Sequence, residues 1–78
     1  MKKFGHYEKK TNNEEFRRFC EKLDYEWLSD YKAEIRVYPI YGKNGNIVKM
    51  NVQVIADENF VDIDIILTDY FHLEKKAA

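Results

Sequence analysis

The apolar side chains of this chain follow two different periods, and the change between them limits the folds that it can adopt. Between residues 16 and 27 they recur every three or four positions, which is the spacing of one helix face. In residues 34–41, 46–56 and 60–67 they recur at every second position, which is the spacing of one face of a strand. The sequence therefore predicts an α+β fold with the order helix, strand, strand, strand.

The predicted helix spans residues 11–28 and has two alternative capping signals. Thr11 precedes Glu14 by three positions and Asn12 precedes Glu15 by the same spacing, so either pair can form a capping box. The apolar stripe of this helix consists of Phe16, Phe19, Cys20, Leu23 and Trp27. We expect the stripe to cover the apolar face of the sheet.

The strands are predicted to form a three-stranded antiparallel meander with the second strand in the centre. A two-residue turn at Asn44-Gly45 is a strong hairpin signal, and it places Val37 opposite Val52. A second turn then brings Ile63 opposite Val52 from the other side. The predicted core face contains Ile35, Val37, Tyr41, Val48, Met50, Val52, Val54, Val61, Ile63, Ile65 and Leu67.

Pro39 interrupts the first strand of this meander. In the predicted register it occupies a hydrogen-bonded position, although proline has no N–H to donate. We therefore expect the first strand to lie at a sheet edge, with a bulge or break near Tyr38 and Pro39.

The two ends of the chain are less regular than its middle. Residues 1–10 are polar and lysine-rich, and they are predicted to be loosely ordered. Residues 11–78 are predicted to form a single α+β domain. The tail from residue 68 either extends the last strand or forms a short closing helix.

Composition excludes several classes of protein. The 13 basic and 14 acidic residues nearly balance, which is not typical of a general nucleic-acid binder. Cys20 is the single cysteine, so no internal disulfide forms and a reducing compartment is expected. The chain begins with no signal peptide and has no apolar run of about 20 residues that would span a membrane. A soluble, cytoplasmic protein without a membrane partner is therefore expected.

The face of the predicted sheet that turns away from the helix mixes apolar, polar and charged side chains. Mixed faces of this kind are more often interaction sites than plain solvent-exposed surfaces. The alternatives are an ordinary wet face, or a face covered by the tail or by the N-terminal segment. The predicted partner-binding residues are Tyr38, Ile40, Lys49, Asn51, Phe60, Asp62, Asp64 and Ile66.

The sequence contains no set of residues that indicates catalysis. Asp62, Asp64 and Asn51 offer oxygen ligands of the kind that Mg²⁺ accepts, but no Gly-rich phosphate loop or His/Cys cluster accompanies them. The two histidines lie in the terminal segments, and Cys20 lies within the apolar stripe. We therefore predict a protein that is not an enzyme and that has no metal and no cofactor.

The predicted order of elements over residues 11–78 resembles that of the double-stranded RNA-binding domain. That family presents a lysine cluster at the start of its final helix. Here Lys75 and Lys76 fall at the chain's end, after Asp69 and Glu74, so the chain departs from the family at the phosphate-binding positions. This departure argues against membership of the family.

The functional hypothesis is a non-enzymatic module that binds a protein partner or forms a homodimer. Acidic residues at fixed spacing on a very small domain are similar in character to phage-encoded inhibitors, such as anti-CRISPR proteins that present carboxylates to a basic groove. The alternative hypothesis is single-stranded nucleic-acid binding through Tyr38, Phe60 and the N-terminal lysines.

Overall fold

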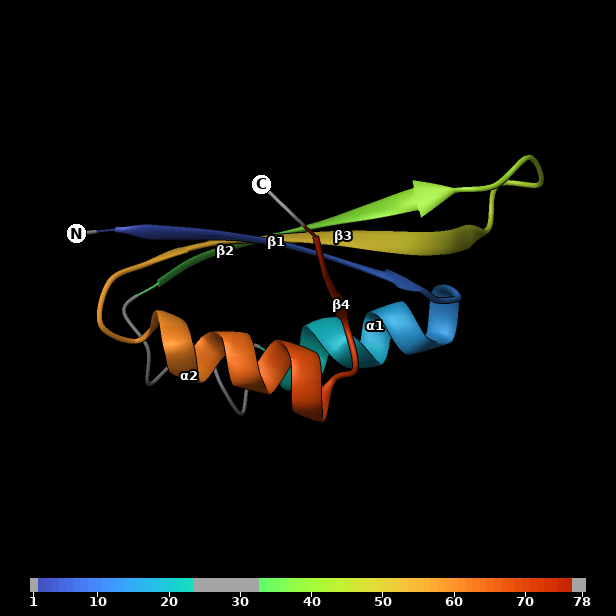
Figure 1. Cartoon of the computed structure of the whole chain (residues 1–78). Helices are drawn as coiled ribbons and strands as arrows, with labels where there is room; N and C mark the ends of the chain where they lie inside the picture. The colour runs from blue at the N-terminus through green and yellow to red at the C-terminus, as the bar shows by residue number, and fades with distance from the viewer. Residues whose placement is uncertain (1, 24–32, 77–78) are drawn as a thin grey trace.

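The protein, described by a computed structural model over residues 2–23 and 33–76, is an α+β domain with a four-stranded antiparallel sheet. The sheet order is β2-β3-β1-β4, and both helical segments lie on one side of the sheet (Figure 1). The elements in chain order are β1 (Lys3–Lys10), α1 (Asn13–Lys22), β2 (Ala33–Tyr41), β3 (Ile47–Ala56), α2 (Phe60–Ile65), the π-helical segment η3 (Ile66–Tyr70) and β4 (Glu74–Lys76). This β-α-β-β-α-β order is a split β-α-β arrangement. The predicted α+β class is confirmed, but the predicted three-stranded meander is wrong.

The N-terminal segment is well ordered, although the sequence predicts that it is loosely ordered. Residues 3–10 form β1, which pairs with β3 along its full length, from Lys3 opposite Ala56 to Lys10 opposite Lys49. Burial alternates along this segment: Tyr7 is fully buried, while its neighbours carry polar side chains on the other face of the sheet. The abundance of lysine concealed this alternation, and β1 takes the place beside β3 that the meander gave to residues 60–67.

Residues 60–67 do not form the third strand that the sequence predicts. They are helical, because Phe60, Ile63 and Leu67 are spaced at i, i+3 and i+7 and all three are buried against the sheet. Val61 and Ile65, which the strand prediction placed in the core, are 55% and 49% exposed. The segment fits both periods, and the tertiary structure selects the helical one. Two other predicted core residues, Tyr41 and Val48, are also exposed.

The β2–β3 hairpin has the predicted pairing but a different turn. Val37 lies opposite Val52, as predicted. However, the Gly42 amide donates to the Asn46 carbonyl at 2.8 Å, so the loop comprises residues 43–45, with Gly45 at a φ of +82°. The pairing then shifts between Ile40 and Tyr41. This irregularity compensates for the longer turn and keeps the rest of the strand in the predicted register.

The altered turn also explains how Pro39 fits into an unbroken strand. The Thr11 amide donates to the Val48 carbonyl at 3.1 Å, so even-numbered residues of β3 direct their peptide groups toward β1 and odd-numbered ones toward β2. Lys49 of β3 lies opposite Ile40 of β2. The odd-numbered residues of β3 therefore form their hydrogen bonds with the even-numbered residues of β2. Pro39 therefore faces the open edge, where no N–H is needed. The predicted edge position is confirmed, and the predicted bulge or break near Tyr38 and Pro39 is found one residue further on, between Ile40 and Tyr41.

The core lies between the sheet and the helical layer. Asn12 caps α1 by accepting a hydrogen bond from the Glu15 amide at 2.9 Å, so the second of the two capping signals is the one used. The remainder of the predicted helix, including Trp27, lies outside the described residues. The buried residues are Tyr7, Phe19, Leu23, Met50, Val52, Val54, Ala56, Phe60, Ile63, Leu67, Phe71 and Leu73. No helix within the described ranges is long and apolar enough to cross a membrane.

Gly5 provides a test of this packing. A Cβ atom at Gly5 would lie 2.6 Å from Tyr7 Oη and 3.0 Å from Phe60 Cζ, both on the core side of β1. We expect Gly5→Ala to destabilise the fold by about 1 to 3 kcal/mol, because the core cannot accept the added methyl group without moving large side chains. Thermal unfolding followed by circular dichroism measures the effect.

The matched control is Gly42→Ala, whose Cβ meets the exposed side chain of Val48 at 2.9 Å. That side chain can turn away into solvent, so the expected cost is within about 0.5 kcal/mol. An equal loss of stability in the two variants would contradict the packing described for β1.

Candidate functional site

The candidate site is the face of the sheet that turns away from the helices. Side chains of even-numbered residues of β1 and β2 and of odd-numbered residues of β3 lie there, in rows fixed by the strand pairing. The described helical segments all lie on the opposite side, so no described helix covers this face (Figure 1). The rows are Phe4, Ile55 and Glu34; His6, Gln53 and Arg36; Glu8, Asn51 and Tyr38; and Lys10, Lys49 and Ile40.

The eight residues predicted to bind a partner fall into two separate groups. The strands bring the first group together on the open face: Tyr38, Ile40, Lys49 and Asn51. The second group belongs to the helical layer on the other side: Phe60, Asp62, Asp64 and Ile66. Phe60 is buried and Ile66 packs against the core, so neither is available on a sheet surface. A single surface of all eight residues does not exist, because residues 60–67 are helical.

Asp64 has a structural role that the sequence did not indicate. Its carboxylate accepts a hydrogen bond from the Tyr7 hydroxyl at 2.5 Å and pairs with Lys75 Nζ at 3.1 Å. It therefore links α2 to β1 and β4. Burial, and then the neighbouring Asp64 carboxylate, raise the pKa of Tyr7 above its ordinary value. Asp62, by contrast, is exposed.

The arrangement of oxygen ligands considered for Mg²⁺ does not form. Asn51 lies on the open face, while Asp62 and Asp64 lie in the helical layer across the sheet. Within residues 2–23 and 33–76, no three His, Cys, Asp or Glu side chains gather as metal ligands.

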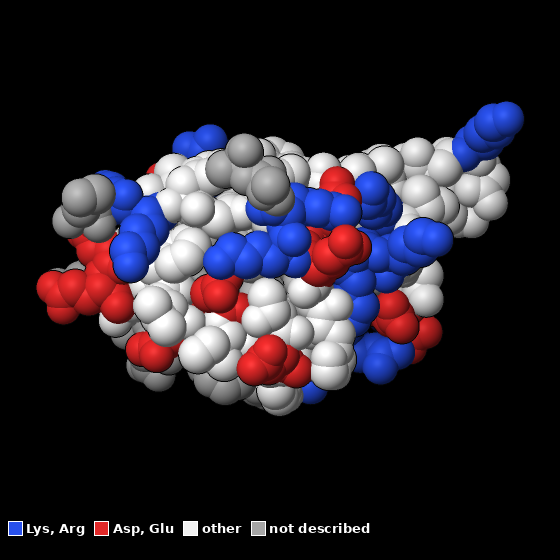
Figure 2. Space-filling model, viewed as in Figure 1, with Lys and Arg blue, Asp and Glu red and all other residues white. Residues whose placement is uncertain are grey.

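Charges on the open face alternate in sign. The Glu8 carboxylate lies 3.2 Å from Lys49 Nζ and 3.4 Å from Lys76 Nζ, and the hydrogen bond from Lys49 contributes most to lowering the pKa of Glu8. Glu34 pairs with Arg36 two residues along β2. Figure 2, which shows the side of the molecule where β4 lies and not the open face itself, has basic side chains gathered near β4 with acidic ones among them. The open face therefore suits a partner that carries charges of both signs better than it suits a polyanion.

Two polar atoms near the centre of this face lack hydrogen-bond partners among the described residues. His6 Nε2 and Asn51 Oδ1 are both shielded from solvent. Buried polar atoms are usually hydrogen-bonded, so each of these two atoms carries a cost in folding free energy. The role of His6, Glu8 and Arg36 was missed from the sequence, although the alternation around Tyr7 was a signal that could have revealed it.

The edge of the sheet at β2 is the second part of the site. β2 is nine residues long and pairs only with β3 among the described strands, whereas the opposite edge strand, β4, has three residues. The odd-numbered residues of β2 direct their peptide groups outward, as derived from the hairpin ladder. A long unpaired edge can accept an added strand, and a short one protects against it.

Comparisons with protein-family models, with curated proteins and with solved structures find no match to this chain. The function is therefore inferred from the geometry and chemistry of the site itself.

The Tyr7–Asp64 hydrogen bond predicts a specific dependence of stability on pH. Because the pKa of Tyr7 in the folded protein lies above that of an unfolded tyrosine, its stabilising contribution holds below about pH 10 and is lost as the pH rises further. We expect the melting temperature to fall more steeply between about pH 9 and pH 11 in the wild-type protein than in Tyr7→Phe.

At neutral pH, Tyr7→Phe is expected to lose about 1 to 2 kcal/mol, since the buried hydroxyl donates to a charged acceptor. The control is Tyr41→Phe, which removes a hydroxyl from a side chain that is 61% exposed. Parallel pH profiles for wild type and Tyr7→Phe would show that the hydrogen bond does not contribute in this way.

Proposed function

We propose that this protein is a non-enzymatic protein-binding module that adds a strand from its partner along the β2 edge, and that the partner is a second copy of the chain. The observation that carries the proposal is the outward direction of the peptide groups of Ala33, Ile35 and Val37 along an edge without a described neighbour. Strand addition of this kind obtains affinity from backbone hydrogen bonds.

Pro39 limits where the added strand can pair. Proline has no N–H to offer to the partner, so pairing is favoured along residues 33–37 and not beyond. A two-fold axis at Ile35 makes this segment the centre of an antiparallel pair. It places Ala33 opposite the partner's Val37, where both residues have outward peptide groups.

The charges on β2 favour the same axis. With the axis at Ile35, Glu34 lies opposite the partner's Arg36, and the same pair forms again on the other side of the axis. An axis at Glu34 or at Arg36 would instead place like charges opposite one another, which is destabilising. The strand is therefore self-complementary in one register.

This dimer would join the two open faces into one continuous surface. Tyr38, Ile40, Lys49 and Asn51, which were predicted to bind a partner, would lie on that surface near the junction. The proposal does not use Phe60, Asp62, Asp64 or Ile66, because they lie in the helical layer. Because the likeness to phage-encoded inhibitors rests on these acidic residues, we do not propose an inhibitor.

Single-stranded nucleic-acid binding is the competing class of function. The open face carries two exposed aromatic side chains, Phe4 and Tyr38, on which bases could stack. The carboxylates of Glu8 and Glu34 lie in the same rows and would repel phosphates. The observations therefore favour a protein partner.

A charge exchange at the β2 edge tests the proposal. The wild-type protein is expected to form a dimer whose population rises with concentration in sedimentation velocity. Glu34→Arg and Arg36→Glu each place like charges across the axis, so each variant alone should dimerise roughly five- to tenfold more weakly. An equimolar mixture of the two variants should recover the dimer, because the opposite charges then face each other.

Lys43→Glu, at the tip of the hairpin, is the matched control for a change of charge and should leave dimerisation unaltered. A wild-type monomer at all concentrations would overturn the proposal, as would single variants that dimerise normally. Binding of a single-stranded oligothymidylate at low salt by a monomeric protein would favour the nucleic-acid class instead.

A further inference from the structure

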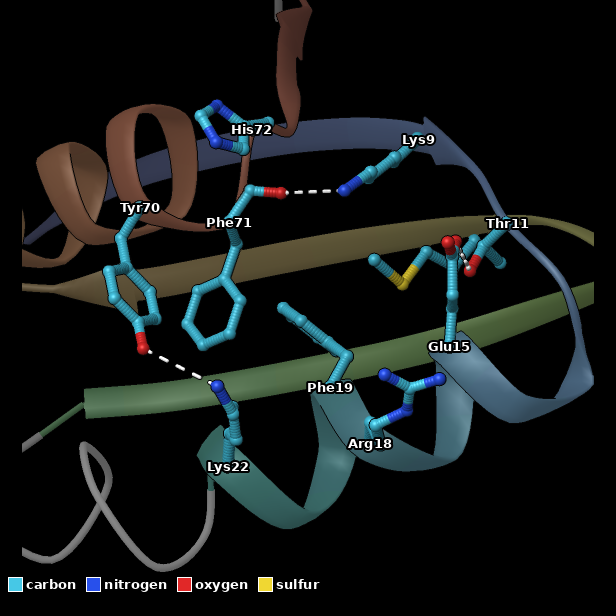
Figure 3. A pocket seen from close by; sticks show the side chains of 10 residues that line it. Lys9, Thr11, Glu15, Arg18, Phe19, Lys22, Tyr70, Phe71 and His72 are labelled. Carbon is cyan, nitrogen blue, oxygen red and sulfur yellow. Dashed lines mark hydrogen bonds between the residues drawn. The ribbon is translucent and has the colours of Figure 1, made fainter.

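A groove lies between α1, β1 and the segment that follows η3, away from the β2 edge (Figure 3). Its volume is about 370 Å³, which is within the range of small-molecule sites. The lining residues come from separate parts of the chain and include Lys9, Arg18, Phe19, Lys22, Phe71 and His72.

Aromatic rings from two elements line the groove. The rings of Phe19 and Phe71 meet edge to face with centroids 4.8 Å apart, and Tyr70 packs on Phe71 at the same centroid distance. Figure 3 shows Phe71 and Tyr70 on one side and Phe19 of α1 on the other. Phe19 and Phe71 are 5% and 9% exposed, so Tyr70, at 49%, offers most of the ring surface on which a flat aromatic group gains from offset or edge-to-face contacts.

Basic side chains surround these rings. Lys9 Nζ donates to the Phe71 carbonyl at 2.9 Å, and Lys22 Nζ lies 5.6 Å from the centre of the Tyr70 ring. Arg18, which pairs with Glu14, completes the basic lining, and Glu15 is the one carboxylate among the described residues that line the groove. The lining therefore favours an anionic group.

The segment that closes the groove has an unusual backbone. It leaves a π-helical turn, in which the Phe71 amide donates to the Ile66 carbonyl, and it then passes through His72 at a φ of +60°. The Leu73 amide closes the helix end on the Leu67 carbonyl at 2.9 Å. Glycine is the usual residue at such a helix end, whereas here a histidine that borders the groove takes the position. π-Helical turns and unusual backbone conformations are both frequent at binding sites.

We infer that this groove binds a small molecule that combines a flat aromatic ring with an anionic group, either a carboxylate or a phosphate. The ring would pack against Tyr70 and the small exposed part of Phe71, and the anionic oxygens would lie among Arg18, Lys22 and Lys9. The inference does not depend on dimerisation, since no residue of β2 lines the groove.

Isothermal titration with three probes tests the inference. 2-Naphthoate and 1-naphthyl phosphate carry the required charge, and their relative affinities decide which anionic group is preferred. 2-Naphthamide has nearly the same shape as 2-naphthoate without the charge, and it should bind at least about tenfold more weakly. Added salt should weaken binding of the two anions but not of the amide.

Single substitutions locate the site. Lys22→Met and Arg18→Met should each weaken binding of the preferred anion by roughly five- to tenfold, whereas Lys43→Met at the hairpin tip should not. Glu34→Arg at the β2 edge should also bind normally, which separates this inference from the proposed dimer. No binding of either anion, equal binding of the amide, or normal binding by both groove variants would overturn the inference.

His72→Gly provides an independent readout. Glycine adopts a positive φ without steric cost, so the melting temperature is expected to rise by about 4 °C. Because His72 borders the groove, the same variant should bind the preferred anion about threefold more weakly, despite its greater stability. Unchanged affinity would assign to His72 only its place at the helix end and would remove it from the site.

Discussion

The pairing of β1 with β3 is the constraint on which the rest of the structure depends. It places a segment near the start of the chain in the middle of the sheet, between β3 and the short β4. It also inserts Tyr7 beneath the helical layer, where its hydroxyl reaches Asp64 and where the absence of a side chain at Gly5 leaves room for the ring. Because β1 occupies this position, residues 60–67 cannot pair with β3, and they bury their apolar side chains as a helix.

The sequence was sufficient to predict the α+β class, the beginning of α1 to within one residue, and the pairing of β2 with β3. These features rest on local signals, namely a capping residue at Asn12, a turn containing Gly45, and strict alternation on both sides of that turn. Each signal indicates a single structure, because the residues that form it are close together both in sequence and in space.

The features that the sequence did not predict depend on contacts between distant segments. Residues 60–67 satisfy two periods at once, since Asp62 and Asp64 alternate with apolar residues while Phe60, Ile63 and Leu67 form a helical stripe. The choice between strand and helix depends on which segment pairs with β3, and β1 is the segment that does so. The groove was missed for a similar reason, because Lys9, Lys22 and Phe71 come together only after β1, α1 and the end of η3 have packed.

The alternation of peptide groups along β3 connects the core to the proposed dimer edge. The hydrogen bond between Thr11 and Val48 fixes which residues of β3 serve β1, and hence which serve β2. The irregularity beside the hairpin turn then determines that the odd-numbered residues of β2 face outward. The three-residue turn and the ladder between β1 and β3 agree in this respect, because both direct the even-numbered residues of β2 toward β3. A two-residue turn in the same register would have required Pro39 to face β3, in conflict with the ladder that β1 imposes.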